Sequence, residues 1–224
     1  LVFWCIVAVF VGGRIGHLFF YEFDRLAADP LVLFRFREGG IASHGSAFAL
    51  LLTLWGFARA KRLAFLEVCD RIAPAVALAS MTVRIGNLFN SEVVGRITDQ
   101  SWGMRFPYYD HTHTGAPLRH PTQLYESAMG LLILVVIMIA DRKLGEDRPR
   151  GLLAALFWSI YFPGRFIIEF FKEYQTLPTG AALTMGQWLS IPLTLFGWAA
   201  LYLVVRRGVA AGWTPLTVTS QKTG

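Results

Sequence analysis

Long apolar runs alternate along the chain with shorter connections that hold most of the charged residues. A helix needs about 20 apolar residues to cross the hydrocarbon core of a bilayer, and several runs approach or reach that length. The runs are too long and too continuously apolar for the two-residue alternation of barrel strands. We therefore predict an all-α, polytopic transmembrane helical bundle with about six visible spans: residues 1–23, 41–58, 72–89, 123–140, 152–171 and 187–205.

The start of the chain and its longest connection extend the prediction. The chain begins at Leu1, inside an apolar run, without a methionine or the basic start of a signal peptide. We expect the amino-terminal part to be incomplete and a further span to precede it. The rest is interpreted as one integral membrane domain over residues 1–224, in which the long connection at 91–122 forms a small external cap.

Composition agrees with a membrane protein. Hydrophobic residues make up 54% of the chain and charged residues 16%, whereas about a quarter of a soluble domain is charged. The formal net charge of +6 comes largely from basic residues in three connections, at 59–71, 142–150 and 206–207. Alternating spans place these three on one side, which the positive-inside rule makes cytoplasmic together with the C-terminus. The basic balance thus reflects topology, and nucleic acid is not an expected partner.

Cysteine usage suggests neither a disulfide nor a metal site. Cys5 is predicted within a helix and Cys69 in a cytoplasmic loop, so the two are poorly placed to pair. His111 and His113 lie in the predicted cap without a third ligand at metal-binding spacing. We predict no metal and no organic cofactor.

The segment from Arg84 to Arg96 carries polar groups at the end of an apolar run. On a helix, Arg84, Asn87 and Asn90 share one face, and Glu92 is able to pair with an arginine. Such groups in a membrane protein usually have a function or a partner, and here there are more of them than packing requires. The alternative is a purely structural polar clamp between helices.

A second pair of charged groups lies in another apolar run, at Arg165 and Glu169. Their spacing of four allows pairing on one helix face, which is also a self-contained structural explanation. Pro163 and Gly164 beside them are able to open the helix locally. Because arginine is a planar and permanently charged phosphate ligand, the two intramembrane arginines suggest a site for an anionic lipid headgroup.

Two glycine-containing segments complete the candidates. The segment at 12–17 is interpreted as a helix-packing face with one snorkelling arginine, Arg14. His44, flanked by small residues at a helix start, is a candidate proton acceptor because histidine titrates near neutral pH. The alternative for His44 is a capping or hydrogen-bonding role.

These segments, in this order, resemble the phosphatidylglycerol–prolipoprotein diacylglyceryl transferase family of bacterial inner membranes. The resemblance covers nearly the whole chain, and the Arg84–Arg96 segment is close to the family signature. The other matching motifs are Gly12-Gly13-Arg14-Ile15-Gly16, Gly39-Gly40 with Ser43-His44-Gly45, His120 to Glu126, Arg165 to Glu169, and Met185-Gly186-Gln187 with Leu189-Ser190.

The resemblance implies an activity and its partners. The family moves the diacylglyceryl group of phosphatidylglycerol to the lipobox cysteine thiol in the signal peptide of a preprolipoprotein, forming a thioether and releasing glycerol phosphate. Membrane lipid surrounds the site, which the predicted topology places toward the external leaflet of the inner membrane. Carried over to this chain, it makes Arg84 and Arg165 the phosphate ligands and His44 the candidate base or a positional group. The remaining substrate-binding candidates are Asn87, Asn90, Glu92, Gly95 and Glu169.

The chain departs from the family pattern at three positions: Ser46 replaces a glycine, His17 a common tyrosine, and Lys172 a frequent arginine. A functional tyrosine of the family's first helix is absent from the sequence as written. Two other functional classes therefore stay open: a non-enzymatic membrane binder or transporter, and an inactive relative that binds anionic phospholipid. Only an enzyme releases glycerol phosphate in step with thiol consumption.

Overall fold

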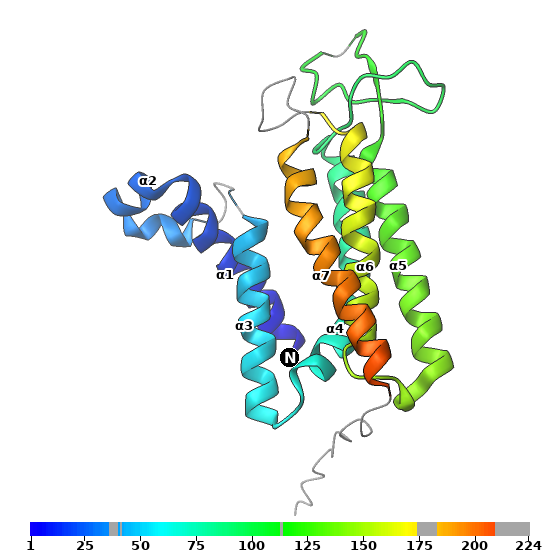
Figure 1. Cartoon of the computed structure of the whole chain (residues 1–224). Helices are drawn as coiled ribbons and strands as arrows, with labels where there is room; N and C mark the ends of the chain where they lie inside the picture. The colour runs from blue at the N-terminus through cyan, green and yellow to red at the C-terminus, as the bar shows by residue number, and fades with distance from the viewer. Residues whose placement is uncertain (36–39, 41, 113, 174–182, 209–224) are drawn as a thin grey trace, which may run out of the picture. The chain divides into compact units, whose positions relative to one another are not determined.

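The structure is a computed structural model that describes residues 1–35, 40, 42–112, 114–173 and 183–208, with the side chains of Ser43, His44 and Glu146 excepted. It divides into two compact units, Leu1–Val68 and Cys69–Gly224. Both are built mainly from helices, as the ribbon in Figure 1 shows. The fold is that of an all-α polytopic membrane protein, whereas its organisation as one domain stays a prediction.

The first unit is organised around two long helices, α1 (Val2–Tyr21) and α3 (Ser43–Lys61), which pack against each other. Two short elements lie between them in sequence, α2 (Phe23–Ala28) and the 3₁₀ helix η1 (Pro30–Phe34). Neither short helix was anticipated, because residues 24–40 were interpreted as a loop. Asp29 caps η1 by accepting a hydrogen bond from the Leu31 amide at 3.1 Å.

Small residues set the distance between α1 and α3. A methyl group added at Gly16 would lie 2.8 Å from the Cα of Gly45, and one added at Gly12 would collide with the side chain of Ala49. Because lipid provides no hydrophobic driving force between helices, such close backbone contact supplies the van der Waals attraction that joins them. The predicted packing face at 12–17 is therefore confirmed.

We expect Gly45→Leu to destabilise the protein, because the added side chain would overlap the α1 backbone. Overpacking of this kind costs about 1–3 kcal/mol. Gly56→Leu on the same helix is the matched control, since nothing lies within 4 Å of a methyl group at that position. Thermal unfolding in detergent should show a lower midpoint for Gly45→Leu alone; equal midpoints for the two variants would contradict the packing role.

Arg14 corrects one interpretation from the sequence. Its side chain does not snorkel to a polar surface but is buried, with 1% of its surface exposed. Nη2 donates to the carbonyl oxygen of Val32 at 2.9 Å. Because η1 folds back against α1, it brings a backbone acceptor to the guanidinium, which the linear sequence pattern did not reveal.

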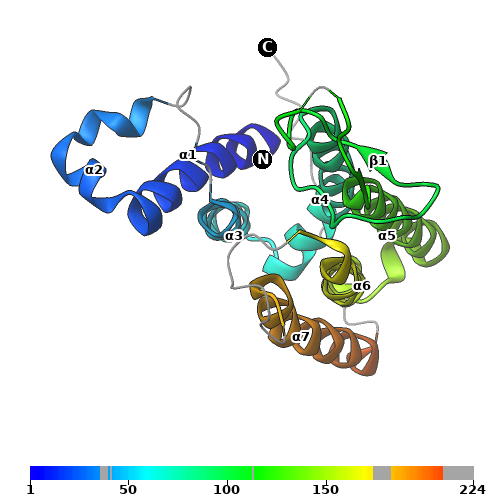
Figure 2. The same cartoon turned by 90° about the horizontal axis from the view of Figure 1, so that it is seen from above.

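The second unit holds four long helices: α4 (Phe65–Phe89), whose first turn belongs to the first unit, α5 (Thr122–Leu144), α6 (Leu152–Ile168) and α7 (Met185–Arg207). Seen from one end in Figure 2, α6 lies between α5 and α7, and it packs against both. The short 3₁₀ helices η3 (Gly145–Asp147) and η4 (Glu169–Phe171) follow α5 and α6. A buried core joins α4, α5 and α6 through Ala73, Ala77, Met129, Ile133, Ile137 and Leu153.

Every predicted span corresponds to a helix. In the part of the chain that the structure describes, five helices are long and apolar enough to cross a membrane: Val2–Tyr21, Phe65–Phe89, Thr122–Leu144, Leu152–Phe171 and Met185–Arg207. The remaining predicted span, 41–58, is α3, which is less apolar because polar residues begin it and Arg59 and Lys61 end it.

The start of α4 differs from the prediction. The helix begins at Phe65, so that Cys69 and Arg71 lie in a helix and not in a loop. Asp70 explains the extension, since its carboxylate accepts hydrogen bonds from the amides of Gly151 at 2.7 Å and Ala154 at 2.9 Å. These amides at the start of α6 have no acceptor within their own helix, and the buried carboxylate supplies one. Cys69, like Cys5, is a free thiol.

The connection between α4 and α5 forms the predicted cap, drawn in green above the helices in Figure 1. It contains a short antiparallel pair, β1 (Met104–Arg105) with β2 (Leu118–Arg119). Arg119 fixes this cap: Nη2 donates to Asp110 at 2.6 Å, and Nη1 donates to Glu173 at 2.6 Å and to the Gly95 carbonyl at 3.2 Å. Hydrogen bonding to Asp110 raises the pKa of Arg119 above its ordinary value, so the residue stays charged.

Arg119→Leu is expected to lower the free energy of unfolding by about 3–5 kcal/mol, the usual cost of breaking a buried charge pair. Asp110, whose side chain is 11% exposed, would keep its charge without its arginine. Arg142→Leu, at an exposed arginine, is the control and should have little effect. Denaturant titration in mild detergent measures both, and equal stabilities would refute the anchoring role.

Candidate active site

Arg84 lies near the end of α4 and begins a chain of polar contacts. Its Nη1 donates to the Asn87 side-chain oxygen at 3.2 Å, and the Asn87 amide donates to a Glu92 carboxylate oxygen at 2.7 Å. The predicted shared face of Arg84 and Asn87 follows from the helical spacing of three. Asn87 thus holds the guanidinium on one side and the carboxylate on the other.

A strained turn follows α4. Ser91 and Val93 both have a φ of 55°, which is rare for residues with a side chain and exceptional for a β-branched one. The start of α5 holds this turn in place. The Thr122 hydroxyl donates to the Val93 carbonyl at 2.9 Å, and the Gln123 amide donates to the Glu92 carbonyl at 2.7 Å. Strain maintained by such contacts is typical of functional sites.

Glu126, one turn further along α5, is the acidic partner of Arg84. One carboxylate oxygen pairs with Nε of Arg84, and the other lies 2.5 Å from Nζ of Lys172. Only 4% of the Glu126 side chain is exposed. Glu92, expected from the sequence to pair with an arginine, instead contacts Asn87. Glu126 belonged to a matching motif but had been given no role.

The second arginine, Arg165, lies near the same carboxylate of Glu126. Arg165 on α6 is attracted by Tyr161 and by the carboxylates of Glu126 and Glu169, without a direct ion pair to either carboxylate among the described residues. The Glu169 carboxylate forms its ion pair with Lys172, at 3.4 Å, rather than closing on Arg165. A methyl group at Gly186 would lie 2.5 Å from the Glu169 carboxyl carbon, so the glycine lets the start of α7 approach the site.

Gly95 joins the backbone on both sides of the cluster. Its amide donates to the His120 carbonyl at 3.1 Å, and it forms a β-bridge with Lys172. A methyl group at Gly95 would lie 2.7 Å from the Cβ of His120 and 2.8 Å from the carbonyl oxygen of Phe171. Three segments that are distant in sequence therefore meet at a position where only glycine fits.

The arrangement is a partly buried ionic cluster of three cations and two carboxylates: Arg84, Arg165, Lys172, Glu126 and Glu169. Its members come from α4, α5, α6, η4 and the residue after η4, at the end of the bundle next to the cap. Guanidinium and ammonium groups held in this way suit the binding of a phosphate group.

Comparison with known proteins assigns the family. The family model for prolipoprotein diacylglyceryl transferase matches residues 1–203. The chain belongs to this family.

Curated relatives agree over most of their length. A phosphatidylglycerol–prolipoprotein diacylglyceryl transferase of Pseudoalteromonas atlantica is 39% identical over 218 residues, covering 94% of this chain and 75% of the relative. A protein of the same name from Idiomarina loihiensis is 40% identical, and the match covers 92% of this chain and 74% of the relative. Another from Neisseria gonorrhoeae is 38% identical, and the match covers 87% of this chain and 75% of the relative. The resemblance found in the sequence is thus confirmed.

Two predicted residues of this family site are not joined to the ionic cluster by a described contact. Asn90 follows the end of α4, is exposed, and its side chain forms no hydrogen bond in the described part of the chain. His44 is the second residue of α3, in the other compact unit, and its side chain lies outside the described residues. The roles of both stay predictions.

An aromatic contact near the ionic cluster was also missed. The Tyr125 hydroxyl lies 3.1 Å from Nδ1 of His120 and accepts a hydrogen bond from the Trp102 indole at 3.1 Å. The sequence had placed Tyr125 in the matching segment His120 to Glu126 without a role of its own. The contact instead ties the cap to the start of α5, next to the residues that support the strained turn.

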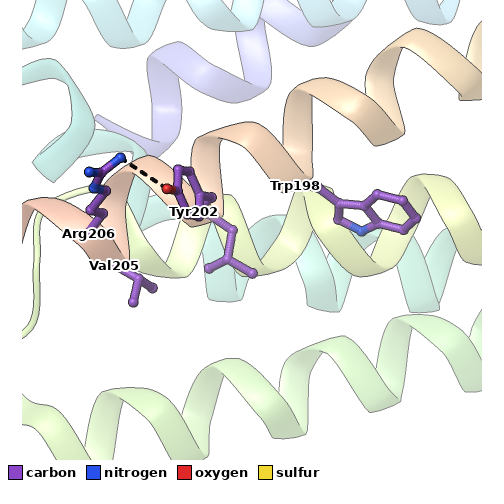
Figure 3. A pocket seen from close by; sticks show the side chains of 5 residues that line it. Trp198, Tyr202, Val205 and Arg206 are labelled. Atoms are coloured by element: carbon purple, nitrogen blue, oxygen red, sulfur yellow. Dashed lines mark hydrogen bonds between the residues drawn. The ribbon is translucent and has the colours of Figure 1, made fainter.

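An apolar hollow of about 390 Å³ lies elsewhere on the protein, along α7 (Figure 3). It is lined by Trp198, Leu201, Tyr202, Val205 and Arg206, the last donating to the Tyr202 hydroxyl at 3.0 Å. At about 1.5 Å per residue, Trp198 lies about 18 Å along the helix from Gly186, which contacts the cluster. The hollow is therefore separate from the ionic cluster, and its lining is almost wholly apolar.

Proposed function

We propose that the protein transfers the diacylglyceryl group of phosphatidylglycerol to the lipobox cysteine thiol of preprolipoproteins. Family membership supports the reaction, since the curated relatives carry the name phosphatidylglycerol–prolipoprotein diacylglyceryl transferase. The observation that carries the assignment to particular residues is the ionic cluster. It supplies two arginines and a lysine for the phosphate of the donor lipid.

The chemistry fits such a cluster. A free thiol has a pKa near 8.5, so removal of its proton by a base favours attack at neutral pH. The sulfur electron pair forms a bond to a glycerol carbon, and the bond from that carbon to the phosphate oxygen breaks. The departing electron pair stays on glycerol phosphate, which thereby gains a negative charge. Cations positioned at that oxygen lower the barrier, because they stabilise the charge as it develops.

Arg84 and Arg165 are proposed to hold the phosphate. In Arg84, Nε is engaged by Glu126 and Nη1 by Asn87, which orients the guanidinium and leaves its Nη2 for a ligand. Glu92, through Asn87, and Glu169, through the charge of Arg165, orient the two arginines. His44 is proposed as the base or as a group that positions the thiol, and Asn90 as a contact for the headgroup.

The protein is a multi-pass protein of the bacterial inner membrane. We place the C-terminus in the cytoplasm and the ionic cluster toward the external leaflet. Basic residues in the last turns of α5 and α7 support this orientation: Arg142, Lys143, Arg206 and Arg207. They lie at the end of the second unit opposite the cap, and the positive-inside rule makes that end cytoplasmic.

Donor lipid with deuterated acyl chains tests the reaction. The purified protein is mixed with a lipobox peptide in micelles that contain deuterated phosphatidylglycerol, and the mass of the peptide is measured by mass spectrometry. The proposal predicts a mass gain equal to one deuterated diacylglyceryl group on the cysteine. Loss of this gain in His44→Ala, with lipid binding retained, would support a base or thiol-positioning role. An unmodified peptide with folded wild-type protein would reject transfer.

A further inference from the structure

Lys172 is a buried cation for which family membership assigns no role. Only 6% of the residue is exposed, and its ammonium lies 2.5 Å from Glu126 and 3.4 Å from Glu169. Taking an ammonium out of water costs several kcal/mol, which two carboxylates offset. Its backbone is also fixed, because its carbonyl accepts a hydrogen bond from Nε of Arg96 at 2.9 Å.

The charges of the cluster do not balance without a ligand. Arg84, Arg165 and Lys172 contribute three positive charges, and Glu126 and Glu169 contribute two negative charges. The five residues of the cluster therefore carry a surplus of one positive charge, and Glu173, the next residue along the chain, pairs with Arg119 of the cap. A phosphodiester carries one negative charge, so its binding makes the cluster neutral. With a neutral residue at position 172, the cluster would already be neutral, and the phosphate would bind without a surplus positive charge.

Lys172 also limits how Glu126 engages Arg84. A carboxylate frequently binds a guanidinium through both of its oxygens. Here one Glu126 oxygen is taken by Lys172, so the other alone pairs with Arg84 at Nε. In the described part of the chain, the Nη2 group of Arg84 forms no hydrogen bond. The lysine thus leaves that edge of the guanidinium open to a phosphate oxygen.

We propose that Lys172 is a positioning residue that sets the charge of the anion site: it supplies the surplus positive charge and keeps Glu126 from closing on Arg84. This inference rests on the proposed function, since the anion is taken to be the phosphodiester of the donor lipid. It differs from a structural role in what it predicts for charge-balanced variants. Removing one cation and one carboxylate together preserves the surplus, whereas removing the cation alone does not.

The test compares KM for phosphatidylglycerol and kcat in the full-length protein with Lys172→Gln, Lys172→Arg and the double variant Lys172→Gln with Glu126→Gln. We expect Lys172→Gln to raise this KM about tenfold or more, with little change in KM for the lipobox peptide. Lys172→Arg should stay within about threefold of wild type, because the charge is kept. The double variant should recover most of the lost affinity, since Arg84 and Arg165 then face Glu169 alone.

The inference is overturned if folded Lys172→Gln keeps the wild-type KM, or if the double variant is no better than the single one. Should Lys172→Gln fail to fold, the double variant decides alone: a KM near wild type supports the inference and a tenfold increase rejects it. Retention of phosphatidylglycerol by the protein, measured by native mass spectrometry, tests the charge role of Lys172 separately from the proposed transfer reaction. An inactive wild type whose lipid retention falls with Lys172→Gln rejects transfer and supports the charge role.

Discussion

Arg84→Ala is expected to lower kcat for diacylglyceryl transfer by about 10²–10³-fold, the usual effect of removing a group that stabilises developing negative charge. The loss has two parts. The leaving phosphate loses a cation, and the buried Glu126 loses the partner of one carboxylate oxygen. Steady-state release of glycerol phosphate measures the effect, with the variant and the wild type at equal concentrations of folded protein.

Two variants make the Arg84 result specific. Arg84→Lys keeps the charge but not the planar fork that reaches both Glu126 and Asn87, so we expect an intermediate rate. Arg142→Ala removes an exposed arginine from the last turn of α5 and should leave the rate unchanged. If Arg84→Ala and Arg142→Ala lower the rate equally, net charge and not the ionic cluster determines activity.

Gly95→Ala should reduce the transfer rate by about 100-fold, the order of loss that a displacement of about 1 Å at a reacting centre produces. The added methyl group would collide with the carbonyl oxygens of His120 and Phe171, forcing apart the segment that carries Lys172 and the one that leads into α5. Both segments deliver charged groups to the cluster, so the damage is geometric rather than chemical.

Gly86→Ala is the matched control for Gly95. It is the same substitution, on α4 two residues after Arg84, at a position with nothing within 4 Å of an added methyl group. We expect an unchanged rate and a slight gain in stability from the better helix propensity of alanine. A fully active Gly95→Ala variant would show that the three segments are able to separate without disturbing the cluster.

The sequence was sufficient for the long helices because a bilayer leaves few alternatives to a long apolar helix. Arg84 with Asn87 was also predictable, since their contact depends only on helical spacing. The start of α4 was misplaced because Asp70 and Arg71 indicated a loop, whereas Asp70 binds the first amides of α6, 81 positions later. No local pattern contains that partner.

The same limit applies to the ionic cluster. Glu126 pairs with residues from two other elements, and Lys172 was noticed only as a departure from the family pattern. Spacing suggested that Arg165 and Glu169 pair with each other, but the Glu169 carboxylate instead forms an ion pair with the ammonium of Lys172. Choices among several possible ion-pair partners depend on three-dimensional packing, which one sequence does not specify.

The most direct test of the account is the stoichiometry of a single experiment. Thiol loss from a lipobox peptide and release of glycerol phosphate are followed together in phosphatidylglycerol micelles, for wild type and Arg84→Ala. We expect one glycerol phosphate per thiol consumed in the wild type, with both signals falling at least about 100-fold in the variant. Coupled turnover that Arg84→Ala leaves intact, or folded wild-type protein that binds the lipid without turnover, would contradict it.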